Sequence, residues 1–182
     1  MNDEKFWKIA KTEKGFEGKW IHINLDKILL PDGTNILFEA IEFQRHGAGI
    51  VAENEKGEVM LVKNYRYIND FYSWEIPAGT IPPDMDPLDC VIEELKEEAG
   101  CIANKNDIKL VCTYHPSIGS SNQIFYCYLA KNVLKVTENT DANEIVETKW
   151  FSKDEIVDMI RNQVIKDGFT LYLLMRHLFL PI

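Results

Sequence analysis

The chain has 182 residues, of which 46% are hydrophobic and 27% charged, and its formal net charge is -9. This length and composition are typical of one folded domain with its own core, and they exclude a disordered chain, a collagen and a disulfide-stapled miniprotein. The acidic balance argues against a nucleic-acid-binding surface, and no apolar run approaches the ~20 residues of a membrane span. Residues 1–5 are polar and precede no signal-peptide core. We therefore predict a cytoplasmic protein whose partners include neither nucleic acid nor a membrane.

The predicted elements begin with strands. Residues 1–17 are charged and are expected to form a partly ordered arm. Alternation predicts a strand over 20–30, and residues 36–43 return after the turn signal Pro-Asp-Gly-Thr, which together indicate a hairpin. Residues 47–52 and 59–62 flank a second turn signal and are predicted to form a second hairpin. A short strand is expected at 74–76.

The pattern then changes to a helical period. Asp86 is predicted to be an N-cap, with Pro87 at the first helical position, Asp89 as a capping-box acid and Gly100 just past the end. The helix is indicated by one apolar stripe: Leu88, Val91, Ile92, Leu95 and Ala99.

Strands resume after this helix and are followed by two more helices. Strands are predicted at 108–114, 124–129 and 145–151, and a capping box at 152–155 opens a second helix. A last helix is expected over 170–178. Many strands, one helix, more strands and then helices predict an α+β fold or a sandwich, not alternating βαβ units.

Carboxylates gather on the first predicted helix. Glu94, Glu97 and Glu98 lie at i, i+3 and i+4, which places them on one face, and Glu93 adds a fourth acid. Oxygen-rich clusters suit hard cations such as Mg²⁺ or Mn²⁺. On spacing alone, a solvated acidic helix face is the more common explanation. The four cysteines show no C-x-x-C spacing, so neither a zinc knuckle nor a redox dithiol is predicted: Cys90, Cys101, Cys112 and Cys127.

The segment from Gly79 to Cys101 resembles the Nudix hydrolase signature. That signature is glycine, five residues, glutamate, seven residues, then Arg-Glu-apolar-x-Glu-Glu-x-Gly-apolar, and the match runs without a gap. Two positions depart from it, because Met85 stands at the first glutamate and Glu93 at the arginine. The preceding Trp-Glu-Ile-Pro-Ala-Gly at 74–79 resembles the ADP-ribose pyrophosphatase branch.

Further segments share this resemblance. Arg66 ends a strand as the substrate-contacting arginine does in that branch, and residues 116–122 and 144–147 resemble its later loops. Trp20 and Phe38 stand where some members place two aromatics around adenine, and Glu39 follows as an acid does there.

The resemblance implies a fold and a domain organisation. It predicts an α+β fold of the Nudix type, an α/β/α sandwich with a mixed β-sheet and an N-terminal antiparallel sheet. Residues 1–45 would then form an arm and hairpin for dimerisation, and residues 46–182 would form the Nudix hydrolase domain. The implied partners are a nucleoside diphosphate sugar substrate and a second copy of the chain, in a homodimer.

The resemblance also implies a reaction, which is hydrolysis of ADP-ribose or a related nucleotide sugar to AMP and a sugar phosphate. Mg²⁺ is the expected cofactor, with Mn²⁺ as an alternative. The expected metal ligands are Glu94, Glu98, the Ala78 carbonyl and the assisting Glu97. Gly79 and Thr80 join the aromatics, Glu39 and Arg66 as expected substrate-binding residues.

Catalysis needs a group that accepts a proton from water. Some members use a glutamate where this chain has Gln123, whose neutral amide cannot act as a base. Glu144 is therefore the candidate base, beside Glu97 as the second predicted catalytic residue.

Each assignment has an ordinary structural alternative. Trp20 and Phe38 also suit sheet packing or a dimer interface, Arg66 a surface ion pair, and Glu144 a solvent-facing position. Glu93 places a like charge where an arginine would pair with Glu97. Two functions therefore stay open: a metal-dependent pyrophosphatase, and a Nudix-fold module that binds a nucleotide or protein partner with little turnover. GDP-mannose and other nucleotide sugars compete with ADP-ribose as the substrate.

Overall fold

The computed structural model describes residues 6–180, which fall into two compact units. One unit holds the chain up to His46 together with Ser117–Gln123, and the other holds Gly47–Pro116 and the chain from Ile124 onward. Within residues 6–180, no helix is both long and apolar enough to cross a bilayer.

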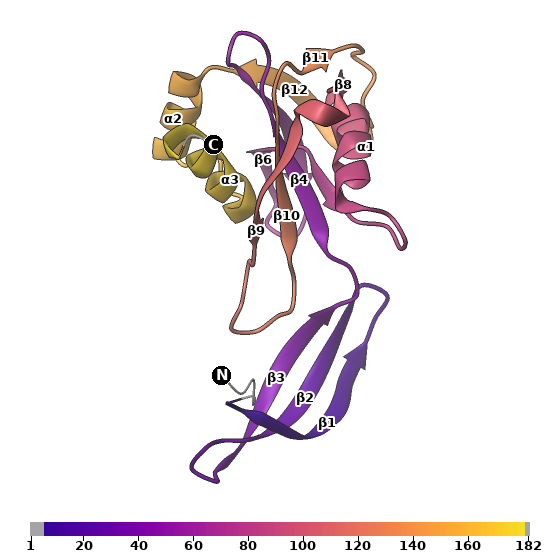
Figure 1. Cartoon of the computed structure of the whole chain (residues 1–182), viewed down its shortest axis with the longest axis vertical. Coiled ribbons are helices and arrows are strands. Elements are labelled where there is room, and N and C mark those ends of the chain that lie inside the picture. The colour runs from indigo at the N-terminus through magenta and orange to yellow at the C-terminus, as the bar shows by residue number, and fades with distance from the viewer. Residues whose placement is uncertain (1–5, 181–182) are drawn as a thin grey trace. The chain divides into compact units, whose positions relative to one another are not determined.

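The N-terminal unit is a three-stranded antiparallel sheet in the order β1-β2-β3 (Figure 1). Its strands are β1 (Lys8–Glu17), β2 (Ile21–Leu29) and β3 (Asn35–Phe43). The predicted hairpin is confirmed, because β2 and β3 pair from Ile21↔Phe43 to Leu29↔Asn35. The turn between them uses Gly33 at φ 88°, a backbone conformation that favours glycine.

The prediction of a partly ordered arm over 1–17 is wrong for residues 8–17, and residues 1–5 lie outside the described part. Strand β1 pairs with β2 from Lys8↔Leu29 to Glu17↔His22. Every residue of β1 is exposed, so the strand is held by backbone pairing rather than by an apolar face. A hydrophobic pattern therefore could not reveal it.

The larger unit contains a mixed sheet in the order β7-β4-β10-β9. Its strands are β4 (Gly47–Ala52), β7 (Ala78–Thr80), β9 (Ile108–Tyr114) and β10 (Phe125–Ala130). Strands β4 and β10 run parallel, and the other two pairs are antiparallel.

A second sheet has the order β12-β5-β6, and a short ladder joins two further strands. The second sheet contains β5 (Val59–Arg66), β6 (Phe71–Glu75) and β12 (Ile145–Phe151), and the ladder pairs β8 (Cys101–Ile102) with β11 (Leu134–Lys135).

The predicted second hairpin is wrong, because β4 and β5 lie in different sheets. The turn itself is present, since the Asn54 amide donates to the Glu58 carbonyl at 2.9 Å. Beyond a single bridge between Glu53 and Val59, the two strands do not pair. Strand β4 already has β7 on one edge and β10 on the other, which leaves no free edge for β5.

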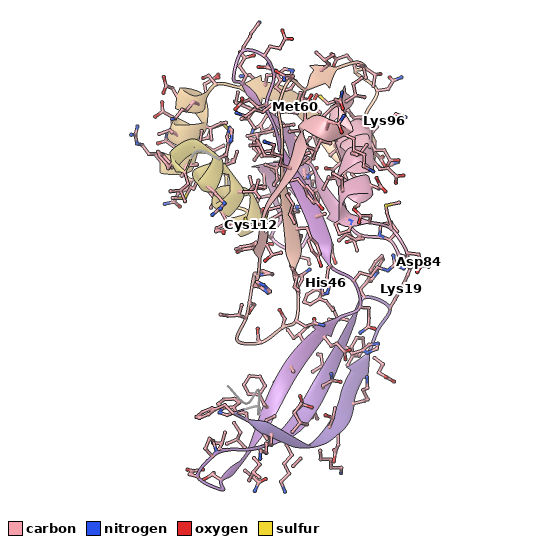
Figure 2. All side chains as sticks on the ribbon, in the orientation of Figure 1. Lys19, His46, Met60, Asp84, Lys96 and Cys112 are labelled. Carbon is pink, nitrogen blue, oxygen red and sulfur yellow. The ribbon has the colours of Figure 1, made fainter. Side chains whose placement is uncertain are left out.

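Helices cover the sheets of the larger unit on both faces. Figure 1 shows α1 (Pro87–Ala99) on one side and α2 (Lys153–Arg161) and α3 (Gly168–Phe179) on the other. Ile50 and Met60 belong to the core under α1, and Met60 is labelled in Figure 2, whereas Val51 and Leu61 belong to the core under α2 and α3. The strands thus contribute alternate residues to two cores, and the predicted α/β/α sandwich and α+β class are confirmed.

The ends of α1 follow the sequence with one exception. The Asp86 side chain accepts the Leu88 amide at 2.8 Å, and Gly100 ends the helix at φ 62°. A Cβ on Gly100 would lie 2.2 Å from the Thr137 carbonyl oxygen, so only glycine fits there. Asp89 is not a capping-box acid, because it pairs with Lys105 in the 3₁₀ turn Lys105–Asp107. The capping box of Ser152 and Glu155 on α2 is confirmed.

Candidate active site

A cavity of about 520 Å³ lies within the larger unit, where the ends of β5 and β7 meet α1 and the loop before β12. Its lining residues are Asn64, Tyr65, Arg66, Ala78, Gly79, Thr80, Glu94, Glu98, Ala142, Asn143, Glu144 and Val146. Most of this lining is polar, and three carboxylates from two separate segments meet in it.

Glu98 is the most buried of these carboxylates. Only 6% of the residue is exposed, and the Ala78 amide donates to its Oε2 at 2.9 Å. Burial, together with the charges of Glu94 and Glu144, raises the pKa of Glu98 to about 8 against the opposing effects of the Ala78 amide and Arg66. The site therefore disfavours a charge on Glu98 unless a cation compensates it.

Glu94 lies one helical turn before Glu98 and shares the cavity. Burial and the neighbouring carboxylates Glu97, Glu144 and Glu93 together raise the pKa of Glu94 to about 7. At neutral pH the pair thus carries less negative charge than two free carboxylates would. A divalent cation would reverse this, because it favours the charged form of both groups.

Gly79 makes room for the Glu94 carboxylate. A Cβ at this position would lie 1.7 Å from Oε1 of Glu94, a distance that no side chain can adopt. The Glu94 carboxylate can therefore occupy its position against β7 only with glycine at position 79. This contact gives the first glycine of the motif a specific structural role.

Arg66 is held at the cavity by a buried partner. Its Nε donates to Oε1 of Glu75 at 2.9 Å, and its Nη2 pairs with the second Glu75 oxygen. Glu75 is only 4% exposed, whereas the Arg66 side chain is about half exposed. The hydrogen bond with Glu75 raises the pKa of Arg66, so its charge is secure. Among residues 6–180, Nη1 of Arg66 forms no hydrogen bond, and Arg66 lines the cavity.

Sequence reasoning missed Glu75. The position of Glu75 in its strand could have revealed the contact. Phe71 pairs with Arg66 in the β5–β6 register, and Glu75 lies four residues after Phe71. Residues four apart on a strand share a face, so Glu75 and Arg66 lie on the same side of the β5–β6 hairpin. An acid at the end of a short strand rich in aromatic residues, on the same face as an arginine, could have identified the pair.

Glu144 reaches the cavity from a loop that is tied to α1. The Asp141 amide donates to the Glu97 carbonyl at 3.1 Å, and the amides of Glu144 and Ile145 donate back to the Asp141 carbonyl. This anchored turn places an exposed carboxylate at the cavity edge, opposite Glu94 and Glu98.

The remaining box residues lie away from the cavity. Glu97 and Glu93 are exposed, do not line the cavity, and form no ion pair within residues 6–180. Figure 2 shows Lys96 on the outer side of α1 as well. Met85 packs against the core under α1, so an apolar contact stands where the motif has a glutamate.

The donor set can be compared with what a hard cation requires. In the described residues 6–180, no three His, Cys, Asp or Glu side chains form a preassembled metal cage. Glu94 and Glu98 nevertheless offer carboxylate oxygens within one cavity, and burial makes their shared charge unfavourable without a cation. These residues fit Mg²⁺ or Mn²⁺, which take oxygen ligands and keep several waters.

The predicted aromatic pair lies in the N-terminal unit, and one chain does not bring its members together. Trp20 lies just before β2, where its carbonyl accepts the Gln44 amide. Phe38 pairs with Asp26, which is six residues after Trp20, so the two aromatics lie at different positions along the sheet. Trp20 is 52% exposed and is approached by Lys19 and Arg45. Phe38 lines a different cavity of about 570 Å³ and meets Trp7 edge-on at 6.2 Å. Glu39 is exposed in β3.

Several relatives align with most of the chain, among them a Methanol dehydrogenase activator of Bacillus methanolicus that is 28% identical over 168 residues, or 90% of this chain and 88% of that protein. An ADP-ribose pyrophosphatase of Bacillus subtilis (strain 168) is 26% identical over 166 residues, which is 90% of this chain and 88% of that protein. A CMP-5'-(N-acetyl-N-hydroxy-3-aminopropyl)phosphonate hydrolase of Streptomyces rubellomurinus is 24% identical over 147 residues, or 80% of this chain and 69% of that protein.

A solved structure shares the fold. The crystal structure of an ADP compounds hydrolase superposes with a TM-score of 0.82 at 15% identity, and the match covers 96% of this chain and 94% of that chain. The NUDIX domain family matches residues 43–171, which span every residue of the cavity. The chain therefore belongs to the NUDIX domain family.

Proposed function

We propose that this protein is a metal-dependent pyrophosphatase that cleaves ADP-ribose or a related nucleoside diphosphate sugar to AMP and a sugar phosphate. The observation that carries this proposal is the convergence of Glu94, Glu98 and Glu144 with Arg66 in one polar cavity. Binding alone would not require three carboxylates around a ligand that is itself negatively charged. A hydrolase does require them, to hold a cation and to accept a proton from water.

Each group has a distinct task in this proposal. Glu94, Glu98 and the Ala78 carbonyl would hold Mg²⁺ or Mn²⁺, which neutralises phosphate charge and lowers the pKa of a bound water. Arg66, fixed by Glu75, would present its free Nη1 group to a phosphate oxygen. Glu144 would accept the proton of the attacking water, and Gly79 and Thr80 would lie along the phosphates. Glu97 would assist through the position of Glu94, because it is exposed and does not line the cavity.

The direct test is turnover of a panel of substrates with Mg²⁺ or Mn²⁺. The panel contains ADP-ribose, GDP-mannose and a CMP-linked phosphonate, since two of the relatives are named for ADP-ribose and for a phosphonate of CMP. We expect hydrolysis of at least one member, with a nucleoside monophosphate as one product. Glu144→Gln should lower the rate about 100- to 10,000-fold, because an amide cannot accept the proton. Glu147→Gln, three residues further along, is the matched control and should change the rate little.

We propose further that the protein acts as a homodimer whose contact is made by residues 1–45. A three-stranded sheet with exposed apolar side chains on both faces needs a partner, and a second copy supplies one by two-fold symmetry. The separation of Trp20 from Phe38 within one chain supports this, because Trp20 of one copy could approach Phe38 of the other. A base held between two aromatics would then require both copies.

One observation favours a second function, a binding module with little turnover. Glu93 stands where the motif has arginine, and Glu97 forms no ion pair within the described residues. Glu93 and Glu97 repel each other by about 0.2–0.5 kcal/mol at an exposed site, whereas an arginine at position 93 would attract Glu97. If the protein is an enzyme that Glu93 impairs, Glu93→Arg should raise kcat/KM severalfold without a change in substrate preference. A fall in kcat/KM would mean that Glu93 is adapted to the site, and an absence of turnover in both proteins would favour the binding module.

A further inference from the structure

A pair of thiols lies outside the candidate active site, on the sheet face that α3 covers. Cys112 on β9 and Cys127 on β10 are direct partners in the antiparallel register of these strands. Both belong to the apolar cluster that contains Leu173 and Leu174 of α3, and Figure 2 marks Cys112 beside this helix. Directly opposed residues on antiparallel strands have Cβ atoms about 4.5–5.5 Å apart and on the same side of the sheet.

A β-bulge re-aims one of the two thiols. The register moves from Cys127↔Cys112 to Tyr128↔Leu110, so Val111 is the extra residue of β9. A bulge bends its strand and disrupts the regular alternation of side chains. Val111 and Cys112 consequently both contact the cluster under α3. Cys127 is fully buried, whereas Cys112 is only partly buried and is therefore the accessible thiol of the pair.

Polar groups of α3 surround this pair. A hydrogen bond with Cys112 raises the pKa of Tyr172, and the charge of Arg176, one helical turn later, acts on both Tyr172 and Cys127. Nε of Arg176 is buried and has no hydrogen-bond partner among the described residues. A buried donor without an acceptor is costly, and a thiolate beside it would supply that acceptor.

We propose that Cys112 and Cys127 are a redox-active cross-strand pair that closes to a disulfide by exchange with a low-molecular-weight disulfide. The Cα separation of such opposed residues lies within the range of about 4.4–6.8 Å that disulfides adopt. The cysteine spacing in the sequence predicted no redox dithiol, whereas the β9–β10 register makes partners of residues that are 15 positions apart.

The exchange takes place in two balanced steps. The Cys112 thiolate, its proton released to solvent, attacks one sulfur of the external disulfide, and the other sulfur leaves as a thiolate. Cys127 then loses its proton and attacks the Cys112 sulfur of the mixed disulfide, which expels the second external thiolate. The two protein thiols are oxidised, and the external disulfide is reduced to two thiols.

Burial raises the pKa of Cys127, and its interaction with Cys112 adds to this, so Cys127 rests as a neutral thiol and must lose its proton in the second step. The bond would close a loop over residues 113–126, which includes Ser117–Gln123 of the N-terminal unit. The disulfide would stabilise the folded chain, because it constrains this segment in the unfolded chain.

The test uses the full chain and oxidised glutathione as the probe. After incubation, the protein is quenched in acid, unfolded, alkylated and analysed by intact and peptide mass spectrometry. We expect a mass lower by two hydrogen atoms, a crosslink between the peptides of Cys112 and Cys127, and full alkylation of Cys90 and Cys101. Dithiothreitol should reverse the crosslink. A melting temperature several degrees higher in the oxidised protein would report the closed loop.

Single variants separate the two steps. Cys127→Ser should stop at a stable glutathione adduct on Cys112, and Cys112→Ser should leave Cys127 unmodified because it is buried. Arg176→Gln should slow the second step severalfold, because the charge of Arg176 lowers the pKa of the attacking Cys127 thiol. The proposal would be overturned if all four cysteines of the parent still react with the alkylating reagent after oxidation, or if a glutathione adduct persists on Cys112 of the parent. Retained melting transitions of the reduced variants show that they fold.

Discussion

The two units of the chain differ in how their sheets are covered. In the larger unit, every residue of β4 is buried between helix layers. In the N-terminal unit, Ile28 alone is buried among the described residues, and every residue of β1 is exposed. Backbone pairing is enough to define a sheet, but a charged site also needs a low-dielectric surrounding to shift its pKa values. This explains why the carboxylates with raised pKa values lie in the larger unit, and the exposed N-terminal sheet fits the proposed contact with a second copy.

The largest effect is expected from the buried carboxylate of the larger unit. Glu98→Gln removes a charge that would hold the cation against the transferring phosphate, and kcat/KM should fall on the order of 100- to 1000-fold. Steady-state kinetics with saturating Mg²⁺ measures this. Glu97→Gln, one residue earlier but outside the cavity, is the control and should cost tenfold or less, or about 1.4 kcal/mol. Equal losses in both variants would remove the distinction between lining and outer carboxylates.

The next effect concerns the close approach of β7 to α1. Gly79→Ala places a Cβ where Oε1 of Glu94 lies, so the carboxylate must move by an ångström or more. We expect kcat/KM to fall about 100-fold, since a misplacement of ~1 Å has consequences of this order. Gly119→Ala in the N-terminal unit is the control, because no atom lies within 4 Å of its added Cβ. A loss of activity in the control would show that the effect is not specific to Glu94.

The third expectation concerns stability and pH. The folded pKa values of Glu94 and Glu98, about 7 and about 8, lie above the ordinary value of 4.5. Between about pH 4.5 and 8 the folded chain binds more protons than the unfolded chain, so the metal-free free energy of unfolding should fall as pH rises. Thermal unfolding in a chelator across this range measures the slope.

Mg²⁺ should offset this loss, since it competes with protons for the same oxygens. At 100 times its dissociation constant it would add about 2.7 kcal/mol, and the gain should grow from pH 6 to about pH 8.5. Glu98→Gln should show a smaller gain. A gain that is the same at all pH values, or the same in the variant, would place the ion elsewhere.

The smallest free-energy effect is expected in the N-terminal unit. Leu37 is 69% exposed on β3, and burial of a leucine contributes about 1.5–3 kcal/mol. If a second copy covers it, Leu37→Asp should weaken the dimer by a factor of ten or more, and light scattering with dilution would detect the monomer. Leu110→Asp on β9 of the larger unit, with 55% exposure, is the control and should leave the dimer unchanged. A parent protein that stays monomeric at micromolar concentration would contradict this expectation.

The sequence by itself determined the elements whose signals are local. The apolar stripe of α1, its Asp86 cap and its Gly100 end each depend on residues within a few positions, so the helix could be predicted. The same holds for the β2–β3 hairpin and the capping box of α2. The spacing of Glu94 and Glu98 also placed both carboxylates on one helix face before the fold was known.

Only the tertiary structure decided which residues meet. Strand β1 has no apolar period, and β4 and β5 separate into two sheets because β10, distant in sequence, takes the free edge of β4. The contact of Glu75 with Arg66, the fit of Gly79 against Glu94 and the opposition of Cys112 and Cys127 all arise between segments that fold together. Burial, which raises the pKa values of Glu94 and Glu98, is likewise a property of the packed chain, because desolvation depends on every neighbour and not on the local sequence.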